Sequence, residues 1–338
     1  MPLLPAPRPI DPAAVPALRW GVIGTGIADR FVHAIHAHTG QRAVAVTARD
    51  AAKTRSFADR HGIARVHASV DALLADAEVD VVYVATPHPL HRKLALAAIA
   101  AGKHVLVEKP IAVSAVDARE ILDAGRAAGV LVMEAMWTRY LPQADVIAQL
   151  LDAGTIGEVA LVRADFGSLV EFDATSRMFD PALGGGAMLD LGVYPVSFAA
   201  SIIGAPSVVR AVGTLAPTGV DDSATIALRT DAGAQAALTA GFRAVTPIEA
   251  TIFGSQGRID VLSPFFGPSG IRLTLSDGTA EEWRDDALPQ VHDGLGYQAT
   301  AFASYVGAGL VESPLHPHGD VVSVMATIDE VRRQIAAG

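Results

Sequence analysis

Lys109 lies where a side chain can act on a ligand. It follows the mostly apolar run at residues 104–107 and belongs to the triplet Glu108-Lys109-Pro110. The short apolar run predicts a strand of a parallel sheet, and such sheets bind ligands at the carboxyl ends of their strands. We therefore expect the ammonium of Lys109 to stabilise negative charge on a reacting oxygen. The alternative is a strand-end lysine that pairs with Glu108 and whose stem covers apolar surface.

Asp190 and Tyr194 form a second candidate pair. They are four residues apart in the stretch 186–203, which predicts a helix, so they share one face of it. A phenol with a pKa of about 10 is a poor base at neutral pH, but a neighbouring ammonium such as that of Lys109 favours the phenolate. Tyr194 is thus a candidate proton donor and acceptor, and Asp190 a ligand for a substrate hydroxyl. The alternative for Tyr194 is a core tyrosine.

A glycine-rich turn follows the first apolar strand and precedes a helical pattern. In this context backbone N–H groups at a helix N-terminus bind a pyrophosphate. Asp29 occupies the position of the third glycine in the G-x-G-x-x-G pattern, which leaves a plain tight turn as the alternative. The residues expected to contact a dinucleotide through this turn are Gly24, Thr25, Gly26, Ile27 and Ala28.

The choice of dinucleotide depends on the end of the second strand, where an acid binds the ribose of NAD and a cation binds the 2′-phosphate of NADP. Here the strand is followed by Arg49 and Asp50. The guanidinium of Arg49 fits a phosphate, whereas Asp50 fits the N-cap of a helix that ends at Gly62. We expect NADP, with NAD as the alternative if Asp50 binds the ribose instead.

The elements around these residues alternate between strand and helix up to about residue 140. The pattern predicts a doubly wound parallel sheet, an α/β fold of the Rossmann type. The expected strands lie at 18–23, 43–47, 79–85, 104–107 and 131–133, and the expected helices at 27–38, from 51, 89–101 and from 116.

Beyond residue 140 the strands follow one another, with turn signals at 231–233 and 277–278. This order predicts a C-terminal α+β domain with a large, mainly antiparallel, open sheet. One face of the sheet needs a partner, so we expect an oligomer. The expected strands are 158–166, 207–214, 222–229, 234–242, 249–253, 258–262, 271–275 and 279–284, and the expected helices are 142–153, 186–203, 296–310 and 319–336.

Composition limits the classes of function. The 338 residues are 51% hydrophobic and 18% charged, enough for two globular domains, and the absence of cysteine fits a reducing compartment such as the cytoplasm. A net charge of −10 argues against nucleic acid. No apolar run approaches the about 18 residues of a membrane helix. We expect a proline-rich arm at 1–17, a dinucleotide-binding domain at 18–140 and a substrate-binding and oligomerisation domain at 141–338.

From about residue 19 the chain resembles the Gfo/Idh/MocA oxidoreductase family. The resemblance rests on Gly24-Thr25-Gly26, Ala85-Thr86-Pro87, the run 101–105 and Glu108-Lys109-Pro110. The stretches 86–91, 133–140 and 184–194 are similar to the branch of dimeric dihydrodiol dehydrogenases and NADP-linked aldose dehydrogenases. The resemblance implies a Rossmann domain with an open-sheet partner domain, a catalytic Lys109 and a helical acid at Asp190. Tyr194 stands where the inositol dehydrogenase branch has a histidine, and the dihydrodiol branch has a tyrosine as its proposed acid/base.

Other candidates complete the expected site. Glu134 and Arg139 could instead form a buried ion pair, and His33, His36 and His38 lack the carboxylate pattern of a metal site. Further candidates for cofactor contact are Thr86, Pro87, His88, His91, Glu108, Trp137 and Arg139, and for substrate contact Trp137, Arg163, Phe166, Arg177 and Phe179.

These features together predict an NADP-dependent oxidoreductase. It would transfer hydride between nicotinamide and a carbinol or carbonyl of a sugar (aldose) or a trans-dihydrodiol. We expect no metal, nucleic acid or membrane partner, and a homodimer or homotetramer formed through the C-terminal sheet. The alternative is a catalytically silent NADP-binding sensor or regulator of the same fold.

Overall fold

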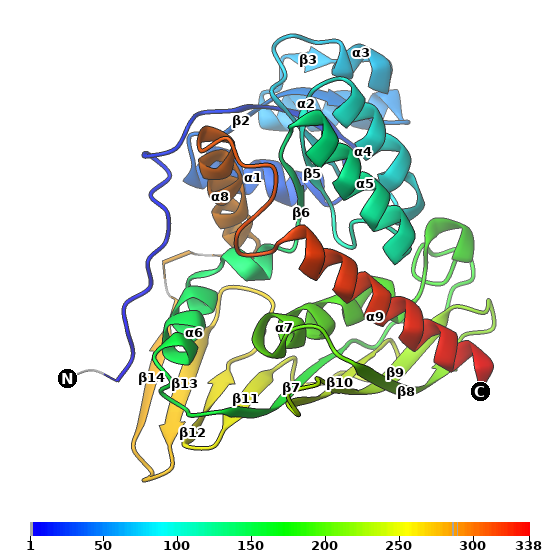
Figure 1. Cartoon of the computed structure of the whole chain (residues 1–338). Coiled ribbons are helices and arrows are strands. Elements are labelled where there is room, and N and C mark those ends of the chain that lie inside the picture. Colours follow the sequence, from blue (N-terminus) through cyan, green and yellow to red (C-terminus); the bar gives the residue numbers. More distant parts are fainter. Residues whose placement is uncertain (1–2, 286, 289) are drawn as a thin grey trace. The chain divides into compact units, whose positions relative to one another are not determined.

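The computed structural model describes residues 3–285, 287, 288 and 290–338, and the chain divides into two units (Figure 1). The first unit contains Ile10–Tyr140 and Pro289–His318, and the second contains Met1–Pro9, Leu141–Leu288 and Gly319–Gly338. The sequence predicted consecutive segments at 1–17, 18–140 and 141–338. In the structure a segment close to the C-terminus also packs with the first unit.

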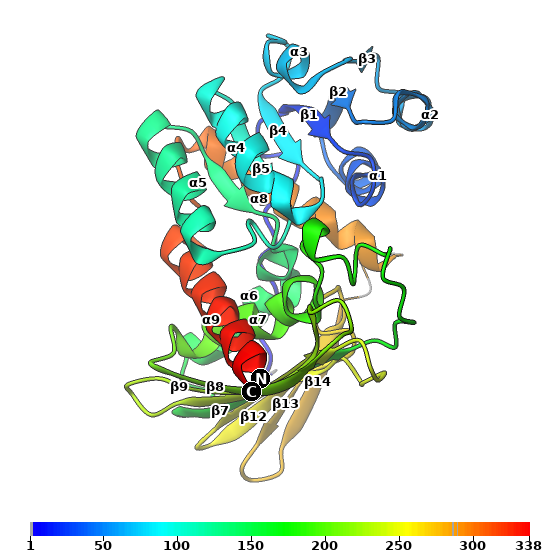
Figure 2. The ribbon, with the colours of Figure 1, turned by 90° about the vertical axis from the view of Figure 1, so that its right-hand side faces the viewer.

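The first unit is a Rossmann fold, which confirms the doubly wound sheet. Its six parallel strands have the order β3-β2-β1-β4-β5-β6. Helices α4 and α5 lie on one side of the sheet and α1 on the other (Figure 2). The strands are β1 (Arg19–Ile23), β2 (Arg42–Thr47), β3 (Arg65–Val66), β4 (Val81–Val84), β5 (His104–Val107) and β6 (Val132–Glu134). The helices are α1 (Ala28–His38), α2 (Ala51–His61), α3 (Val70–Leu74), α4 (His91–Ala100), α5 (Ala115–Ala128) and α8 (Leu295–Gly307), with short 3₁₀ turns η1 (His88–Leu90), η2 (Trp137–Tyr140) and η5 (Val291–Gly294).

Local signals define α2 as the sequence predicted. The Asp50 carboxylate accepts hydrogen bonds from the N–H groups of Ala52 and Lys53, both at 3.0 Å, and Gly62 ends the helix with a positive φ of 66°. The sequence did not predict β3 and α3. Elements of two and five residues are too short for a clear periodicity.

Residues near the C-terminal helix complete the first unit. Helix α8 packs along α1, and the ring of Phe302 in α8 lies 5.1 Å from that of Trp20 in β1. The N–H of Val132 in β6 donates to the carbonyl of Val311 at 3.2 Å. These contacts join segments more than 170 residues apart, which explains why local patterns placed α8 with the strands that precede it.

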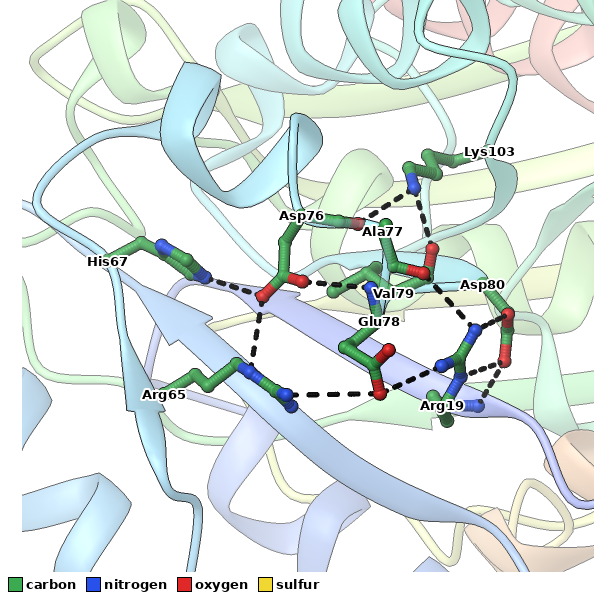
Figure 3. A network of polar contacts seen from close by, with 9 residues as sticks. All are labelled: Arg19, Arg65, His67, Asp76, Ala77, Glu78, Val79, Asp80 and Lys103. Atoms are coloured by element: carbon green, nitrogen blue, oxygen red, sulfur yellow. Dashed lines mark hydrogen bonds and ion pairs between the residues drawn. The ribbon is translucent and has the colours of Figure 1, made fainter.

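An ion-pair network closes the amino ends of the central strands (Figure 3). Arg19 in β1 pairs with Asp80 at 2.7 Å and with Glu78 at 2.9 Å, while Lys103 donates to the carbonyls of Asp76 and Val79. Ligands of such folds bind at the carboxyl ends of the strands. The network therefore lies at the opposite end of the sheet and has a structural role.

The second unit confirms the large open sheet. Its eight strands have the order β14-β13-β12-β11-β7-β10-β9-β8, and every neighbouring pair is antiparallel except β7 with β10. Helices α6, α7 and α9 lie on one face (Figure 2). The strands are β7 (Val159–Gly167), β8 (Val208–Leu215), β9 (Asp221–Arg229), β10 (Gln235–Gly241), β11 (Ala250–Gly254), β12 (Gly257–Val261), β13 (Gly270–Leu275) and β14 (Ala280–Arg284), and the helices are α6 (Pro142–Asp152), α7 (Val193–Ile203) and α9 (His318–Ala337).

One helical stretch passes a length and composition test for a membrane span. It covers Pro181–Ile203, and 67% of its most apolar window is buried within the structure. It includes the helix predicted at 186–203, but Asp190 and the glycines 184–186 keep it from being one continuous apolar run. A mostly buried stretch of this kind is also what the core helix of a folded unit looks like.

Candidate active site

The glycine turn that follows β1 has the geometry of a dinucleotide-binding turn. Gly24 has a φ of 104°, and a Cβ there would lie 2.2 Å from the carbonyl oxygen of Ala85, so only glycine fits. A Cβ on Gly26 would meet no atom within 4 Å, which leaves open space in front of the first turn of α1. The turn therefore has room for a phosphate at a helix N-terminus.

Asp29 explains the missing third glycine. Its carboxylate accepts from Arg60 at 2.7 Å and lies 2.9 Å from His61 Nε2, so it joins α1 to the end of α2. These partners lower the pKa of Asp29, with the hydrogen bond from Arg60 as the largest cause. Asp29 thus holds two helices together, and the turn itself retains its shape.

The carboxyl end of β4 contributes a second feature that fits a cofactor. The Thr86 hydroxyl oxygen is buried and has no hydrogen-bond partner within the part of the chain that the structure describes. A buried polar group of this kind calls for a ligand or a water. His91 follows Thr86 and Pro87 and is fully buried, with its Nε2 2.8 Å from the carbonyl oxygen of Thr86 and its Nδ1 2.9 Å from that of Pro110. Both features fit NAD(P) held by this loop, with His91 as a support for the loop.

Lys109 lies two residues beyond the end of β5 and is partly exposed. The buried Glu108 carboxylate accepts from the Tyr83 hydroxyl and, at 3.2 Å, from the backbone N–H of Lys109. Burial raises the pKa of Glu108, and the hydrogen bond from Tyr83 opposes that rise. The Glu108 side chain therefore supports the backbone that presents Lys109.

Asp190 and Tyr194 lie in the second unit on one continuous helical stretch. The sequence predicted a single α-helix over 186–203, but Met188–Gly192 forms a π-helical turn that leads into α7. Such turns are frequent at functional sites. The Asp190 carboxylate accepts from Arg177 at 3.2 Å, so the structure brings together two of the predicted substrate contacts.

Tyr194 lies in a cluster of aromatic rings. Its ring centroid is 5.5 Å from that of Phe166 in β7 and 5.2 Å from that of Phe266, and the last two rings stack at 4.7 Å. The sequence named Phe166 but missed Phe266, which follows a turn without a motif. An apolar wall beside a phenol suits a substrate with a ring.

Two of the predicted substrate contacts, Arg163 and Phe179, lie apart from the ring of Tyr194. Arg163 lies 5.7 Å from the Phe253 ring on the exposed face of β7, and strand alternation places Phe166 on the opposite face. The structure therefore does not bring Arg163 together with Tyr194. Phe179 is buried against Phe172 and Phe242 rather than grouped with Phe166.

Trp137 and Arg139 both lie in the turn η2. The Trp137 ring is nearly parallel to that of His292, with centroids 6.1 Å apart, and Arg30 Nη1 lies 2.7 Å from His292 Nδ1. Burial and then the charge of Arg30 lower the pKa of His292. Sequence reasoning missed Arg30 and His292, because their contact joins residues 262 positions apart.

The three histidines of α1 have structural partners. His36 Nε2 accepts from the N–H of Ala43 at 3.0 Å, and burial lowers the pKa of His36 to about 4. His33 and His38 face Asp293 at 3.9 and 3.4 Å. Among the residues that the structure describes, no group of three or more such side chains could hold a metal ion.

Comparisons with known proteins agree with this geometry. The profile of the oxidoreductase family with an NAD-binding Rossmann fold, GFO_IDH_MocA, matches residues 18–136, and that of the GFO/IDH/MocA C-terminal domain matches residues 144–260. The chain belongs to the Gfo/Idh/MocA oxidoreductase family. This Gfo/Idh/MocA protein is therefore an NAD(P)-dependent oxidoreductase, as the glycine turn and Lys109 predicted.

Individual relatives cover almost the whole chain. Trans-1,2-dihydrobenzene-1,2-diol dehydrogenase from Danio rerio is 35% identical over 94% of this Gfo/Idh/MocA chain and 97% of its own, and the Homo sapiens enzyme is 31% identical over similar spans. A 3-ketoreductase from Actinomadura kijaniata, solved with NADP and TDP-benzene, is 31% identical with a TM-score of 0.82 and covers 95% of this chain and 98% of its own. Levoglucosan dehydrogenase has a TM-score of 0.86 at 21% identity, over the same shares of the two chains, which shows the shared fold.

Proposed function

We propose that the protein is an NADP-dependent oxidoreductase that interconverts a carbinol and a carbonyl on a sugar or a trans-dihydrodiol. The observation that carries this proposal is the helical stretch on which Asp190 precedes Tyr194 by four residues beside the rings of Phe166 and Phe266. The names of the relatives support the substrate class, because they include a dihydrodiol dehydrogenase and a ketoreductase crystallised with a nucleotide-linked ligand.

Proton transfer is assigned to Tyr194. During oxidation the tyrosinate oxygen takes the proton of the substrate alcohol and becomes the hydroxyl, and during reduction this hydroxyl gives the proton back to the substrate oxygen. We propose that the Lys109 ammonium acts on the same substrate, where it stabilises negative charge on the reacting oxygen and favours the tyrosinate. The nicotinamide, when bound, accepts or supplies the hydride.

The remaining side chains select and orient the substrate. Asp190 accepts a hydrogen bond from a hydroxyl next to the reacting carbon, and Arg177 holds its carboxylate in place. The rings of Phe166 and Phe266 lie against the apolar face of a six-membered ring. A vicinal diol on a flat or chair-shaped ring satisfies both requirements.

Arg49 is assigned the choice of NADP over NAD. Asp50 caps α2 through two backbone N–H groups, and this role favours Arg49 as the group that meets the cofactor. Arg49→Ala should weaken NADP binding about tenfold or more and change NAD binding little, because only NADP carries the 2′-phosphate. Equal losses for both cofactors, measured by fluorescence titration, would show that another residue makes the choice.

We also propose the biological setting. The open sheet face carries exposed apolar side chains such as Val212, which is 71% exposed, and a second copy of the chain would cover them in a homodimer or homotetramer. The proposed partners are small molecules and further copies of the chain, and the proposed compartment is the cytoplasm. The arm at residues 1–17, the cofactor-binding segment 18–140 and the substrate-binding and oligomerisation segment 141–338 remain our functional division.

A spectrophotometric screen tests the function. The purified protein is mixed with NADP or NADPH and with aldoses, inositols, trans-dihydrodiols and the matching ketones, and absorbance is followed at 340 nm. We expect turnover with at least one cyclic diol or sugar and a preference for NADP. Tight cofactor binding without turnover on any of them would instead support an NADP-binding sensor.

A further inference from the structure

Two ionisable side chains form a contact in the interior of the first unit. Glu134 at the end of β6 is 1% exposed and His316 is fully buried, and His316 Nε2 lies 2.8 Å from Glu134 Oε2. A carboxylate only accepts, so the histidine carries its proton on Nε2 and donates it. The side chains come from segments 182 residues apart.

The second oxygen of this carboxylate reaches the loop that carries Lys109. Glu134 Oε1 accepts the backbone N–H of Ile111 at 2.8 Å, and Ile111 is fully buried two residues beyond Lys109. One carboxylate thus connects His316 to the backbone of this loop. Each of its oxygens has a donor at close to the ideal distance.

The loop depends on such side chains because it has no regular structure. Residues 109–114 form neither helix nor strand, so they lack a repeating set of backbone hydrogen bonds. Glu108 accepts the N–H of Lys109, His91 contacts the carbonyl of Pro110, and Glu134 accepts the N–H of Ile111. Three successive residues are therefore each fixed by a different side chain.

His316 is itself held firmly. The Ser313 hydroxyl oxygen accepts the N–H of His316 at 3.1 Å and that of Leu315 at 3.2 Å, and it also accepts from the Tyr140 hydroxyl at 2.8 Å. Burial raises the pKa of Tyr140, so this phenol remains a donor. The segment that carries His316 is thus a fixed support for Glu134.

We propose that Glu134 and His316 are positioning residues that set the place of Lys109 through the Ile111 N–H. The proposal rests on the role of Lys109 given above. A buried polar pair of this kind is weak evidence for stability, since apolar side chains of similar size often serve as well. The contact with His316 instead fixes the position of the Glu134 carboxylate. The oxygen that accepts the Ile111 N–H therefore determines where the loop backbone lies. A displacement of about 1 Å in a reacting group can cost about a hundredfold in rate.

Three variants separate positioning from stability. Glu134→Met combined with His316→Phe fills the space without leaving a buried charge, but it removes the acceptor of Ile111. Glu134→Gln keeps an oxygen for that N–H, and its amide can donate to His316 when the ring proton moves to Nδ1. Leu73→Ala is the matched control for lost stability. It removes most of a fully buried side chain of α3, an element outside the Lys109 loop.

The first readout needs no catalysis. Amide hydrogen exchange of the free protein, followed by mass spectrometry on peptides that span residues 107–114, should be faster in the double variant and near normal in Glu134→Gln and Leu73→Ala. The second readout separates kcat from KM. The double variant should lose about 10–100-fold in kcat with an NADPH dissociation constant within about threefold of wild type, and Glu134→Gln should recover most of the rate.

The outcomes separate an error in the positioning role from an error in the role of Lys109. Unchanged exchange in the double variant, or faster exchange with a normal kcat, overturns the positioning role. A kcat loss in Leu73→Ala as large as that of the double variant also overturns it, because the effect would follow stability. If Glu134→Gln alone folds, an Ile111 amide exchanging as fast as a solvent-exposed one contradicts the proposal. A normal kcat in Lys109→Met would show instead that the proposed function of Lys109 is wrong.

Discussion

The Lys109 loop and the Asp190–Tyr194 helix hold the backbone of their candidate residues in different ways. In both regions a buried carboxylate accepts a backbone N–H next to the functional residues: Glu134 accepts that of Ile111 at 2.8 Å, and Asp221 accepts that of Met188 at 2.6 Å. The loop needs a side chain for each residue. The helix is fixed by its own hydrogen bonds, so one contact at its first turn is enough.

The side chains that accompany the two carboxylates also differ. Glu134 contacts His316 at 2.8 Å, whereas the guanidinium of Arg332 in α9 lies 3.7 Å from Asp221. Asp221 instead faces the positive end of the helix, and a Cβ on Gly186 would lie 2.6 Å from its Oδ1. We therefore expect the irregular loop to be more sensitive to the loss of one support than the helix is.

The largest effect is expected at the loop. Lys109→Met should lower kcat about a hundredfold or more, because it removes charge stabilisation that develops in the transition state, while cofactor affinity changes little. Steady-state rates and an NADPH titration check this. A variant that loses only affinity would make Lys109 a cofactor ligand rather than a catalytic residue.

A smaller effect is expected at the helix, and it depends on pH. Burial raises the pKa of Asp221, with the Met188 N–H and Arg332 acting against the rise and Asp222 adding to it. The stability that this group contributes is therefore fully present below its ordinary pKa and is lost as the pH rises through the folded-state value. Asp221→Asn keeps an acceptor for Met188 and cannot ionise.

Wild type should thus lose stability as the pH rises from 4 to 7, and Asp221→Asn should not. The melting temperature of the variant minus that of wild type should therefore become more positive over this range, by a few degrees. Thermal unfolding of both proteins at several pH values between these limits provides the measurement. A difference that stays constant, or that becomes more negative as the pH rises, would mean that the buried carboxylate gains more from the helix N-terminus than burial costs.

The same contrast shows what the sequence can predict. Patterns in the sequence placed nearly every strand of both sheets within two residues. Strands of the first sheet are short runs of buried apolar residues, and strands such as β9 and β10 of the second alternate buried and exposed side chains. Motifs identified Lys109, Asp190 and Tyr194 as candidates for chemistry. Each of these signals is local in the chain.

The supports of the candidate site could not be predicted in this way. His316 and Asp221 act through contacts with residues 182 and 33 positions away, and neither belongs to a motif. The placement of α8 beside α1 has the same cause, because a helical pattern does not specify the surface against which the helix packs. The π-helical turn around Asp190 is a change of one residue per turn, which no periodicity of this length resolves.

The most direct test of the account is the pH dependence of oxidation by Tyr194→Phe. The variant keeps the ring among Phe166 and Phe266 and removes only the hydroxyl, so the fold should be unchanged. We predict a loss of about a hundredfold in kcat. The pH profile of the rate should also lose the ionisation of the general base, which is the rise in oxidation rate as Tyr194 loses its proton. A raised KM with the wild-type profile would make Lys109 the base, and wild-type kcat and KM would contradict any catalytic role for Tyr194.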